Sequence, residues 1–184
     1  MIPDRFVRSL DAFESVLLAV PADRWLAPSP CDDWAAIDVA GHVIAGLLLI
    51  EMRAAGTPLP DADPGWRETA GEDPVATWRS VRARMTAALG PDGLARRVEL
   101  AFGLEITVGD WLEQYPLELL VHAWDLAEAT GQTVVFDPDL ARGALESARR
   151  FAPRGREAGM LKAERAVPGD ADDQARLLAL MGRG

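Results

Sequence analysis

The residues with the clearest chemical potential are Glu118 and His122, four positions apart in the otherwise apolar stretch 117–124. On an α-helix this spacing stacks the two side chains on one face, with Cβ atoms about 5–6 Å apart. Burying a carboxylate and an imidazole there is costly unless something satisfies both groups. A divalent metal ion would do so, because imidazole and carboxylate are standard ligands for zinc and similar ions.

A third ligand is available in His42, the only other histidine of the chain, which also lies in an apolar helical stretch. A catalytic zinc ion commonly takes three protein ligands and leaves a position open, and helical bundles place such ligands on neighbouring helices. We therefore interpret His42, Glu118 and His122 as a metal site. In the alternative reading, both histidines are satisfied core residues and Glu118 is exposed or paired with an arginine.

Other residues near this pair are candidates for supporting roles. Asp125, one turn beyond His122, either accepts a hydrogen bond from the imidazole or is a surface or capping carboxylate. Cys31 is a reactive thiol, a further ligand or simply a small buried residue. The locally basic segment 142–165 would attract an anionic substrate, unless it is only a solvated surface. The candidates for lining a pocket are Trp34, Trp111, Gln114 and Tyr115. The alternative for Trp111 and Tyr115 is that they are plain core residues.

These residues must be positioned by helices. Apolar residues at intervals of three or four predict helices over about 5–20, 35–55, 74–89, 109–130, 137–151 and 171–181. Pro116 predicts that the fourth helix kinks there or begins near Tyr115. Alternation over residues 97–107, including Phe102, predicts a short hairpin. We expect 57–74, which is rich in proline and acids, to be a solvated connection, and 152–170 to be irregular.

Length and composition set the broad class. A chain of 184 residues with 49% hydrophobic and 26% charged residues suits one globular domain over residues 1–184. A net charge of −10 argues against nucleic-acid binding. The longest apolar run, 43–50, is too short for a membrane span, and no signal peptide is recognisable. We expect a cytoplasmic protein, monomeric or homodimeric, without nucleic-acid or membrane partners.

Four motifs in order carry a family resemblance: PCDDW at 30–34, DVAGH at 38–42, the stretch 118–131 with HAWDLAEATG, and 174–183. Together they resemble the mycothiol-dependent maleylpyruvate isomerase group of metal-binding proteins in the DinB-like superfamily. The resemblance implies a mainly α, DinB-like four-helix bundle, here with a short β-hairpin and an extra C-terminal helix. It also implies a divalent metal, usually zinc with nickel or manganese as alternatives, on His42, Glu118 and His122.

The resemblance also implies a chemistry. In such proteins the metal holds a low-molecular-weight thiol, mycothiol in actinobacteria or bacillithiol in some other bacteria, as the nucleophilic thiolate. This implies a thiol-dependent S-transferase or isomerase that acts on a small electrophile. The alternatives are a non-catalytic metal- or ligand-binding module and a metal-free helical scaffold.

The chain departs from the family pattern in three places. The isomerase has a second, sterol-carrier-like domain for which 184 residues leave no room, so we do not expect isomerisation of maleylpyruvate itself. Ala35 replaces a capping threonine, which should weaken the start of the following helix by about 1 kcal/mol. Residues 159–162 replace a Phe-Gly pair in a loop that would shape the pocket, which leaves substrate choice open.

Overall fold

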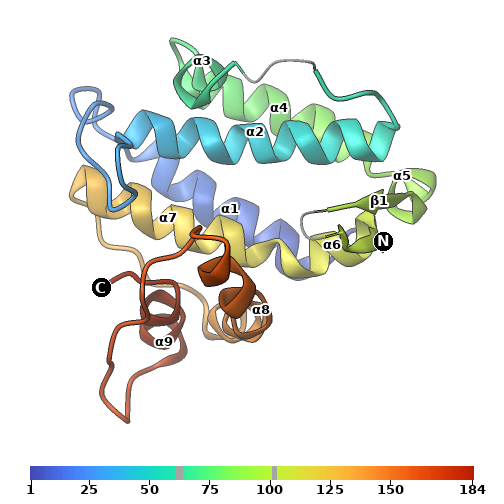
Figure 1. Cartoon of the computed structure of the whole chain (residues 1–184). Coiled ribbons are helices and arrows are strands. Elements are labelled where there is room, and N and C mark those ends of the chain that lie inside the picture. Colours follow the sequence, from blue (N-terminus) through green and yellow to red (C-terminus); the bar gives the residue numbers. More distant parts are fainter. Residues whose placement is uncertain (61–63, 101–102) are drawn as a thin grey trace.

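The computed structural model describes residues 1–60, 64–100 and 103–184. Four of its longer helices pack on one another: α1 (Asp4–Leu18), α2 (Ala36–Ala55), α4 (Pro74–Ala88) and α7 (Pro116–Thr130). Helix α2 packs against α4 and α7, and α1 packs against α7 (Figure 1). Helices α1 and α4 are joined by the rings of Phe13 and Trp78, whose centroids lie 4.9 Å apart. The predicted mainly α fold is confirmed.

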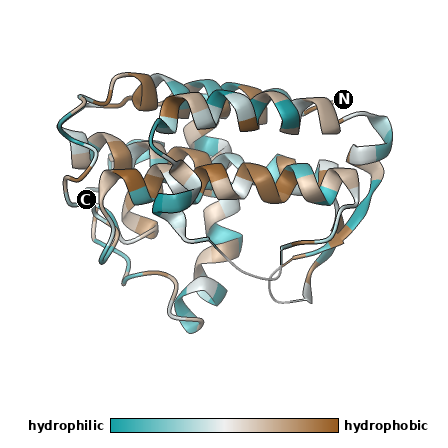
Figure 2. Cartoon of the chain, turned by 90° about the horizontal axis from the view of Figure 1, so that it is seen from above, coloured by the Kyte–Doolittle hydropathy of each residue, from teal (hydrophilic) through white to brown (hydrophobic). Residues whose placement is uncertain are grey.

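The core lies between these helices. Phe6, Phe13, Leu47, Trp78 and Leu120 are completely buried there, and burial of each such side chain contributes about 1.5–3 kcal/mol. Figure 2 shows hydrophobic residues concentrated along the long helices. The apolar residues whose three- and four-residue spacing predicted the helices therefore lie on the helix faces that meet in the core.

Local signals set the helix boundaries around the candidate site. The backbone N–H of Ala35 donates to Asp38 Oδ2 at 2.9 Å, so the start of α2 keeps one capping bond although Ala35 has no capping oxygen. The predicted fourth helix is two helices, α6 (Val108–Gln114) and α7, with Tyr115 at the junction and Pro116 as the first residue of α7. This confirms the break expected near Tyr115. Gly131, with φ of 75°, ends α7.

A two-stranded antiparallel hairpin precedes α6, as predicted. Strand β1 (Arg97–Glu99) pairs with β2 (Glu105–Thr107), and Val98 lies opposite Ile106. Phe102, which belongs to the predicted hairpin pattern, lies outside the described residues. A short helix that the sequence did not indicate, α5 (Pro91–Ala95), leads into β1.

The connection between α2 and α4 differs from the prediction. Instead of being solvated throughout, it forms α3 (Trp66–Ala70), which packs on α2. Gly41 permits this contact, because a Cβ atom there would lie 1.8 Å from the carbonyl oxygen of Trp66. An ion pair of 3.0 Å between Arg67 and Asp38 also joins the two helices. Residues 61–63 of this connection lie outside the described part of the chain.

The C-terminal region contains α8 (Pro138–Glu157) and α9 (Asp173–Leu180). Helix α8 packs against α7 and α9. The prediction that the chain is irregular from residue 152 is wrong as far as Glu157, because α8 continues through Pro153. The fully buried Ala152 anchors this last part of the helix. Among the described residues, no helix combines the length and apolar character needed to cross a membrane.

Candidate metal centre

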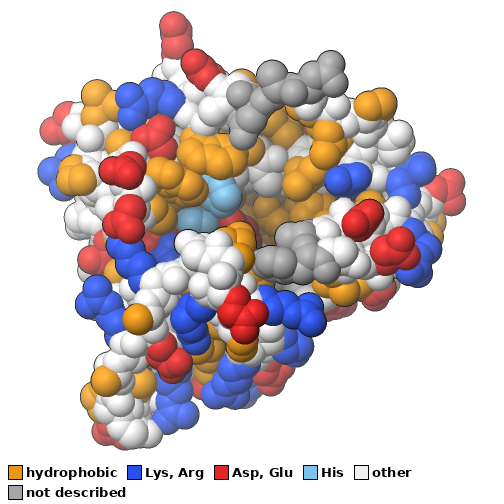
Figure 3. Space-filling view, viewed as in Figure 1, with side chains coloured by type: hydrophobic (Ala, Val, Ile, Leu, Met, Phe, Trp, Pro, Cys, Tyr) orange, Lys and Arg blue, Asp and Glu red, His pale blue; other side chains and the backbone are white. Residues whose placement is uncertain are grey.

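The three predicted ligands converge between α2 and α7. Glu118 Oε1 lies 2.6 Å from His42 Nε2 and 3.2 Å from His122 Nε2. One donor atom from each of the three residues fits within a 4.8 Å span. Figure 3, viewed as in Figure 1, shows a hollow in the surface, with histidine side chains visible on its floor and hydrophobic side chains around them. The sequence spacing and the packing of α2 on α7 therefore produce a compact donor set that is open on one side.

The three groups strongly affect one another's protonation. Burial alone would raise the pKa of Glu118, but the neighbouring His122 and His42 outweigh it and hold that pKa well below its usual value. Burial alone would lower the pKa of His122, but Glu118 and Asp125 favour the imidazolium and raise that pKa well above its usual value. The cluster therefore favours a positive charge beside the Glu118 carboxylate.

The arrangement around His122 suits a cation on its Nε2 side. His122 Nδ1 lies 3.0 Å from Asp125 Oδ2, so the carboxylate stabilises a proton on Nδ1 by its charge, although the N–H does not point straight at the oxygen. A neutral imidazole carries only one N–H, which leaves the Nε2 lone pair facing Glu118 Oε1. Two electron-rich atoms at that separation need a proton or a metal ion between them. Two imidazole nitrogens and one carboxylate oxygen are a donor set that fits zinc and similar ions.

Asp125 is also bound by Arg183, which follows α9. It is fully buried, and its oxygens Oδ1 and Oδ2 accept hydrogen bonds from Arg183 Nε at 3.1 Å and Nη2 at 2.9 Å. Burial alone would raise the pKa of Asp125, but His122 and Arg183 lower it to about 2. Asp125 is thus a charged partner for His122 and not a surface or capping carboxylate.

Cys31 lies beside the same carboxylate. Its Sγ is 3.3 Å from Asp125 Oδ2 and 3.6 Å from Arg183 Nη2. The thiol is half-buried, in a turn in which Asp33 takes the left-handed conformation with φ of 64°. Cys31, His122 and Asp125 also bring their donor atoms within 4.8 Å of one another. Since Arg183 already supplies positive charge there, the set that contains His42 is the better place for a metal ion.

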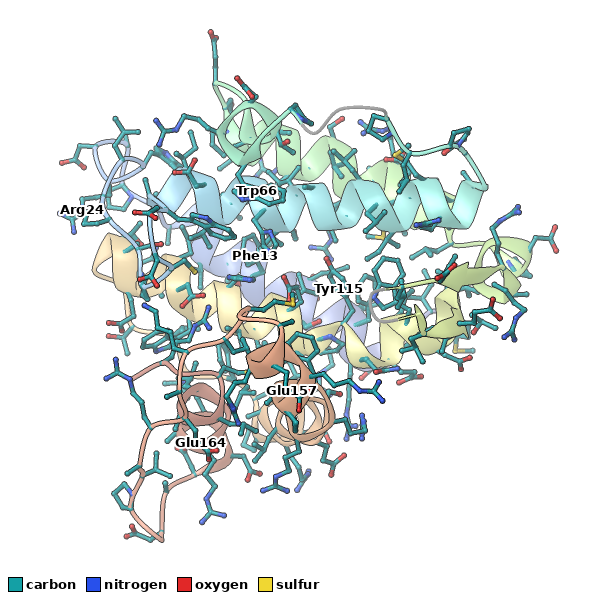
Figure 4. All side chains as sticks on the ribbon, viewed as in Figure 1. Phe13, Arg24, Trp66, Tyr115, Glu157 and Glu164 are labelled. Carbon is teal, nitrogen blue, oxygen red and sulfur yellow. The ribbon has the colours of Figure 1, made fainter. Side chains whose placement is uncertain are left out.

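Two tryptophans border the histidines. The ring of Trp34 lies 5.0 Å from that of His42 and 6.1 Å from that of His122, measured between centroids. The ring of Trp66 meets the ring of His42 edge-on at 4.9 Å. Figure 4 shows Trp66 beside α2, on the side where α3 packs. The predicted pocket residue Trp34 therefore does lie at the site.

The other pocket candidates lie differently. Tyr115 is buried, and its ring contacts the rings of Trp111 and Phe6 at centroid distances of 5.6 and 5.9 Å. Burial and the charge of Glu118 raise the pKa of Tyr115 well above its usual value. Gln114 is exposed, and its amide donates to the backbone oxygen of Asp110 at 3.4 Å. Tyr115 and Trp111 thus belong to one aromatic group, whereas Gln114 faces away from it.

The sequence reasoning missed two residues of this region. Arg183 is the last residue of the 174–183 motif, but the motif alone gave no partner for it. Trp66 lies in the connection rich in proline and acids, where a large aromatic residue was itself a sign of packing. In the basic segment 142–165, several cations have carboxylate partners, such as Lys162 with Asp32 at 2.7 Å and Arg156 with Glu164 at 3.5 Å.

Fold and site together define a mainly helical protein with a candidate metal centre between α2 and α7. Residues 6–127 match the family described as the mycothiol maleylpyruvate isomerase N-terminal domain. The chain belongs to this family, and the resemblance seen in the motifs is confirmed. The matched range includes His42, Glu118, His122 and Asp125.

The chain is also similar to two relatives and to two solved structures. The uncharacterized protein Rv0738 of Mycobacterium tuberculosis is 32% identical over 178 residues, covering 96% of this chain and 94% of the relative. The uncharacterized protein Rv0036c of the same organism is 27% identical over 151 residues, covering 70% of this chain and 58% of the relative. The crystal structure of the mycothiol-dependent maleylpyruvate isomerase is similar, with a TM-score of 0.70 at 16% identity. A histidine-to-alanine mutant of that isomerase gives 0.68 at 17% identity.

The structural match covers 98% of this chain and 89% of the isomerase chain. At 16% identity it shows a shared fold. The expected second domain of the isomerase stays a prediction.

Proposed function

We propose that this protein is a metal-dependent enzyme in which a low-molecular-weight thiol of the mycothiol type attacks a small electrophile, giving S-transfer or isomerisation. His42 Nε2, Glu118 Oε1 and His122 Nε2 would hold one divalent ion, with zinc favoured and nickel or manganese as alternatives. The observation that carries the proposal is the convergence of these donors within 4.8 Å on the floor of an open hollow. Family membership supports the thiol.

The residues around the ion would have distinct tasks. A bound ion supplies Lewis acidity that keeps a thiol in its nucleophilic thiolate form at neutral pH. Asp125 would hold the proton on His122 Nδ1, so that the Nε2 lone pair points toward the ion. Trp34 and Trp66 would shield His42 from water on two sides. No protein general base is needed in this scheme.

The proposal also specifies partners and compartment. The reactants are a thiol and a small electrophilic molecule, and the acidic surface with net charge −10 disfavours nucleic acid. A single cysteine suits the reducing cytoplasm, where such thiols are kept reduced.

The first test is the metal content of the protein purified without a His-tag, measured by elemental mass spectrometry. We expect about one zinc, nickel or manganese ion per chain, and we expect His122→Ala to abolish it. Glu118→Gln should also lose metal, whereas Glu113→Gln, an exposed carboxylate of α6, is the matched control. A folded protein that neither contains metal nor takes up added zinc would overturn the proposal.

A non-catalytic metal-binding module is the second candidate. The observation that favours it is the neighbouring set of Cys31, His122 and Asp125, which offers further protein ligands near the same imidazole. Cobalt substitution separates the two candidates. A thiol-dependent change in the cobalt absorption spectrum supports the enzyme, because it requires an open coordination position, whereas a spectrum that no thiol changes supports the module.

A metal-free scaffold requires a protein partner for Glu118. The partner expected for that reading was an arginine from the segment 142–165. Within the described residues, the ion pairs of Glu118 are with His42 and His122 instead. The metal measurement therefore also tests this third candidate.

A further inference from the structure

The hydroxyl of Tyr115 meets α2 at a position that only glycine allows. A Cβ atom on Gly46 would lie 2.0 Å from Tyr115 Oη and 3.3 Å from Cζ. Glycine in a helix interior costs about 0.5–1 kcal/mol relative to alanine, so a close contact of this kind explains its presence. Gly46 follows His42 by one helical turn, about 6 Å along the axis, on the same face.

The ring that carries this hydroxyl is fixed in place. Phe6 and Trp111 contact it edge-on, with interplanar angles of 75° and 83°. Tyr115 also forms the junction of α6 and α7, three residues before Glu118. Figure 4 shows Tyr115 between α2 and α7, the two helices that carry the metal donors. The hydroxyl therefore has a defined position beside the site.

The Tyr115 hydroxyl makes no hydrogen bond within the described part of the chain. Within the described residues no side chain or backbone group pairs with Tyr115 Oη, whereas His42 and Glu118 pair with each other. Tyr115 Oη is also absent from the polar atoms that are sealed from solvent and lack an aligned hydrogen bond. An unpaired oxygen that is not fully sealed keeps some accessible surface and a free hydrogen-bonding position, and a phenol is a neutral donor at neutral pH.

We propose that Tyr115 Oη donates a hydrogen bond to an acceptor oxygen, such as a carbonyl, of the small molecule held at the His42–Glu118–His122 site. Gly46 is the gap in α2 that lets the hydroxyl lie there. The proposal rests on the proposed function and narrows it. The bound molecule would then carry an oxygen acceptor close to the atom that faces the metal. An electrophile with a carbonyl group next to its reactive carbon meets this requirement.

The test compares two thiol probes on the cobalt-loaded full-length protein. Mercaptoacetamide carries a carbonyl acceptor next to its thiol, and ethanethiol carries none. Dissociation constants are read from the thiolate-to-cobalt absorption band. Tyr115→Phe should weaken mercaptoacetamide about 3- to 10-fold, the usual effect of one hydrogen bond, and leave ethanethiol unchanged. Equal effects on both probes, or no effect on either, would overturn the proposal.

Gly46→Ala is the second variant. Its new methyl group displaces the hydroxyl and should cause the same selective loss. In a Tyr115→Phe background it should cause no further loss, because the oxygen that it displaces is already absent. Circular dichroism and the melting temperature verify the fold of each variant. If wild-type protein binds no cobalt, the proposed function fails and this role with it. If cobalt and both thiols bind without the selective loss, only the role of Tyr115 fails.

Discussion

Arg183 binds both oxygens of the fully buried Asp125 carboxylate, through Nε at 3.1 Å and Nη2 at 2.9 Å. The two residues are 58 positions apart in sequence. Because Asp125 Oδ2 also lies 3.0 Å from His122 Nδ1, the chain end that follows α9 is linked to the candidate metal centre through one carboxylate. Loss of this arginine should therefore affect both the stability of the protein and the orientation of His122.

Replacing Arg183 with methionine should cost about 3 kcal/mol of unfolding free energy, because it removes one of the two cationic partners of a buried carboxylate. Urea unfolding followed by circular dichroism measures this change. Arg142→Met is the matched control, since Arg142 pairs with Asp139 at 3.4 Å on an exposed surface, where such pairs contribute less than about 1 kcal/mol. Equal losses in the two variants would contradict a special role for Arg183.

Asp125→Asn tests the support of the metal ligand itself. The amide keeps the shape of the carboxylate but not its charge, so it no longer fixes the proton of His122 on Nδ1. We expect zinc affinity to fall about 10- to 100-fold, measured by competition with a chromophoric chelator. Glu128→Gln, an exposed carboxylate on the same helix, serves as the control. An affinity equal to that of the wild type would show that Asp125 does not tune the site.

The protonation of His122 predicts how stability depends on pH in the metal-free protein. Its pKa lies well above the usual 6.5, since Glu118 and Asp125 outweigh the opposing effect of burial. The folded state thus binds this proton more tightly than the unfolded state. The resulting stabilisation is complete below the unfolded pKa of 6.5 and is lost as pH rises through the raised folded pKa.

We therefore expect the urea midpoint of chelator-treated protein to fall as pH rises above about 6.5. Glu118→Gln should flatten this slope. Zinc-saturated protein should show the opposite trend, because zinc competes with the proton for His122 and binds more tightly at higher pH. A midpoint that does not change over this pH range without metal would contradict the raised pKa.

Much of this arrangement follows from local sequence. The four-residue spacing of Glu118 and His122, the apolar periodicity of α2 and α7, and the break at Tyr115 are all properties of short segments, so they were predictable. His42 was predictable as a partner because the chain has only one other histidine.

Other features depend on contacts between distant segments. Arg183 reaches Asp125 only after α8 has packed against α7 and α9 against α8, and no local pattern encodes that path. Trp66 approaches His42 because Gly41 lets the backbone of α3 lie directly on α2. A glycine within a helical pattern indicates a close approach, but it does not identify the segment that approaches.

Gly41→Ala tests this contact. A Cβ atom at position 41 would lie 1.8 Å from the carbonyl oxygen of Trp66 and 2.5 Å from its carbonyl carbon. Because these are backbone atoms, α3 must move as a whole. We expect a net loss of about 1–3 kcal/mol in unfolding free energy, as for an overpacked core, although alanine favours a helix. Fluorescence of Trp66, obtained by difference against a Trp66→Phe background, should shift as the indole leaves His42.

Gly90→Ala is the matched control, because nothing lies within 4 Å of the Cβ atom it would add. Its stability and fluorescence should remain those of the wild type. If Gly41→Ala behaves in the same way, α3 does not rest on α2 as described, and Trp66 has no part in shielding His42. If Gly41→Ala loses stability and also binds zinc more weakly, the packing of α3 supports the metal centre as well as the fold.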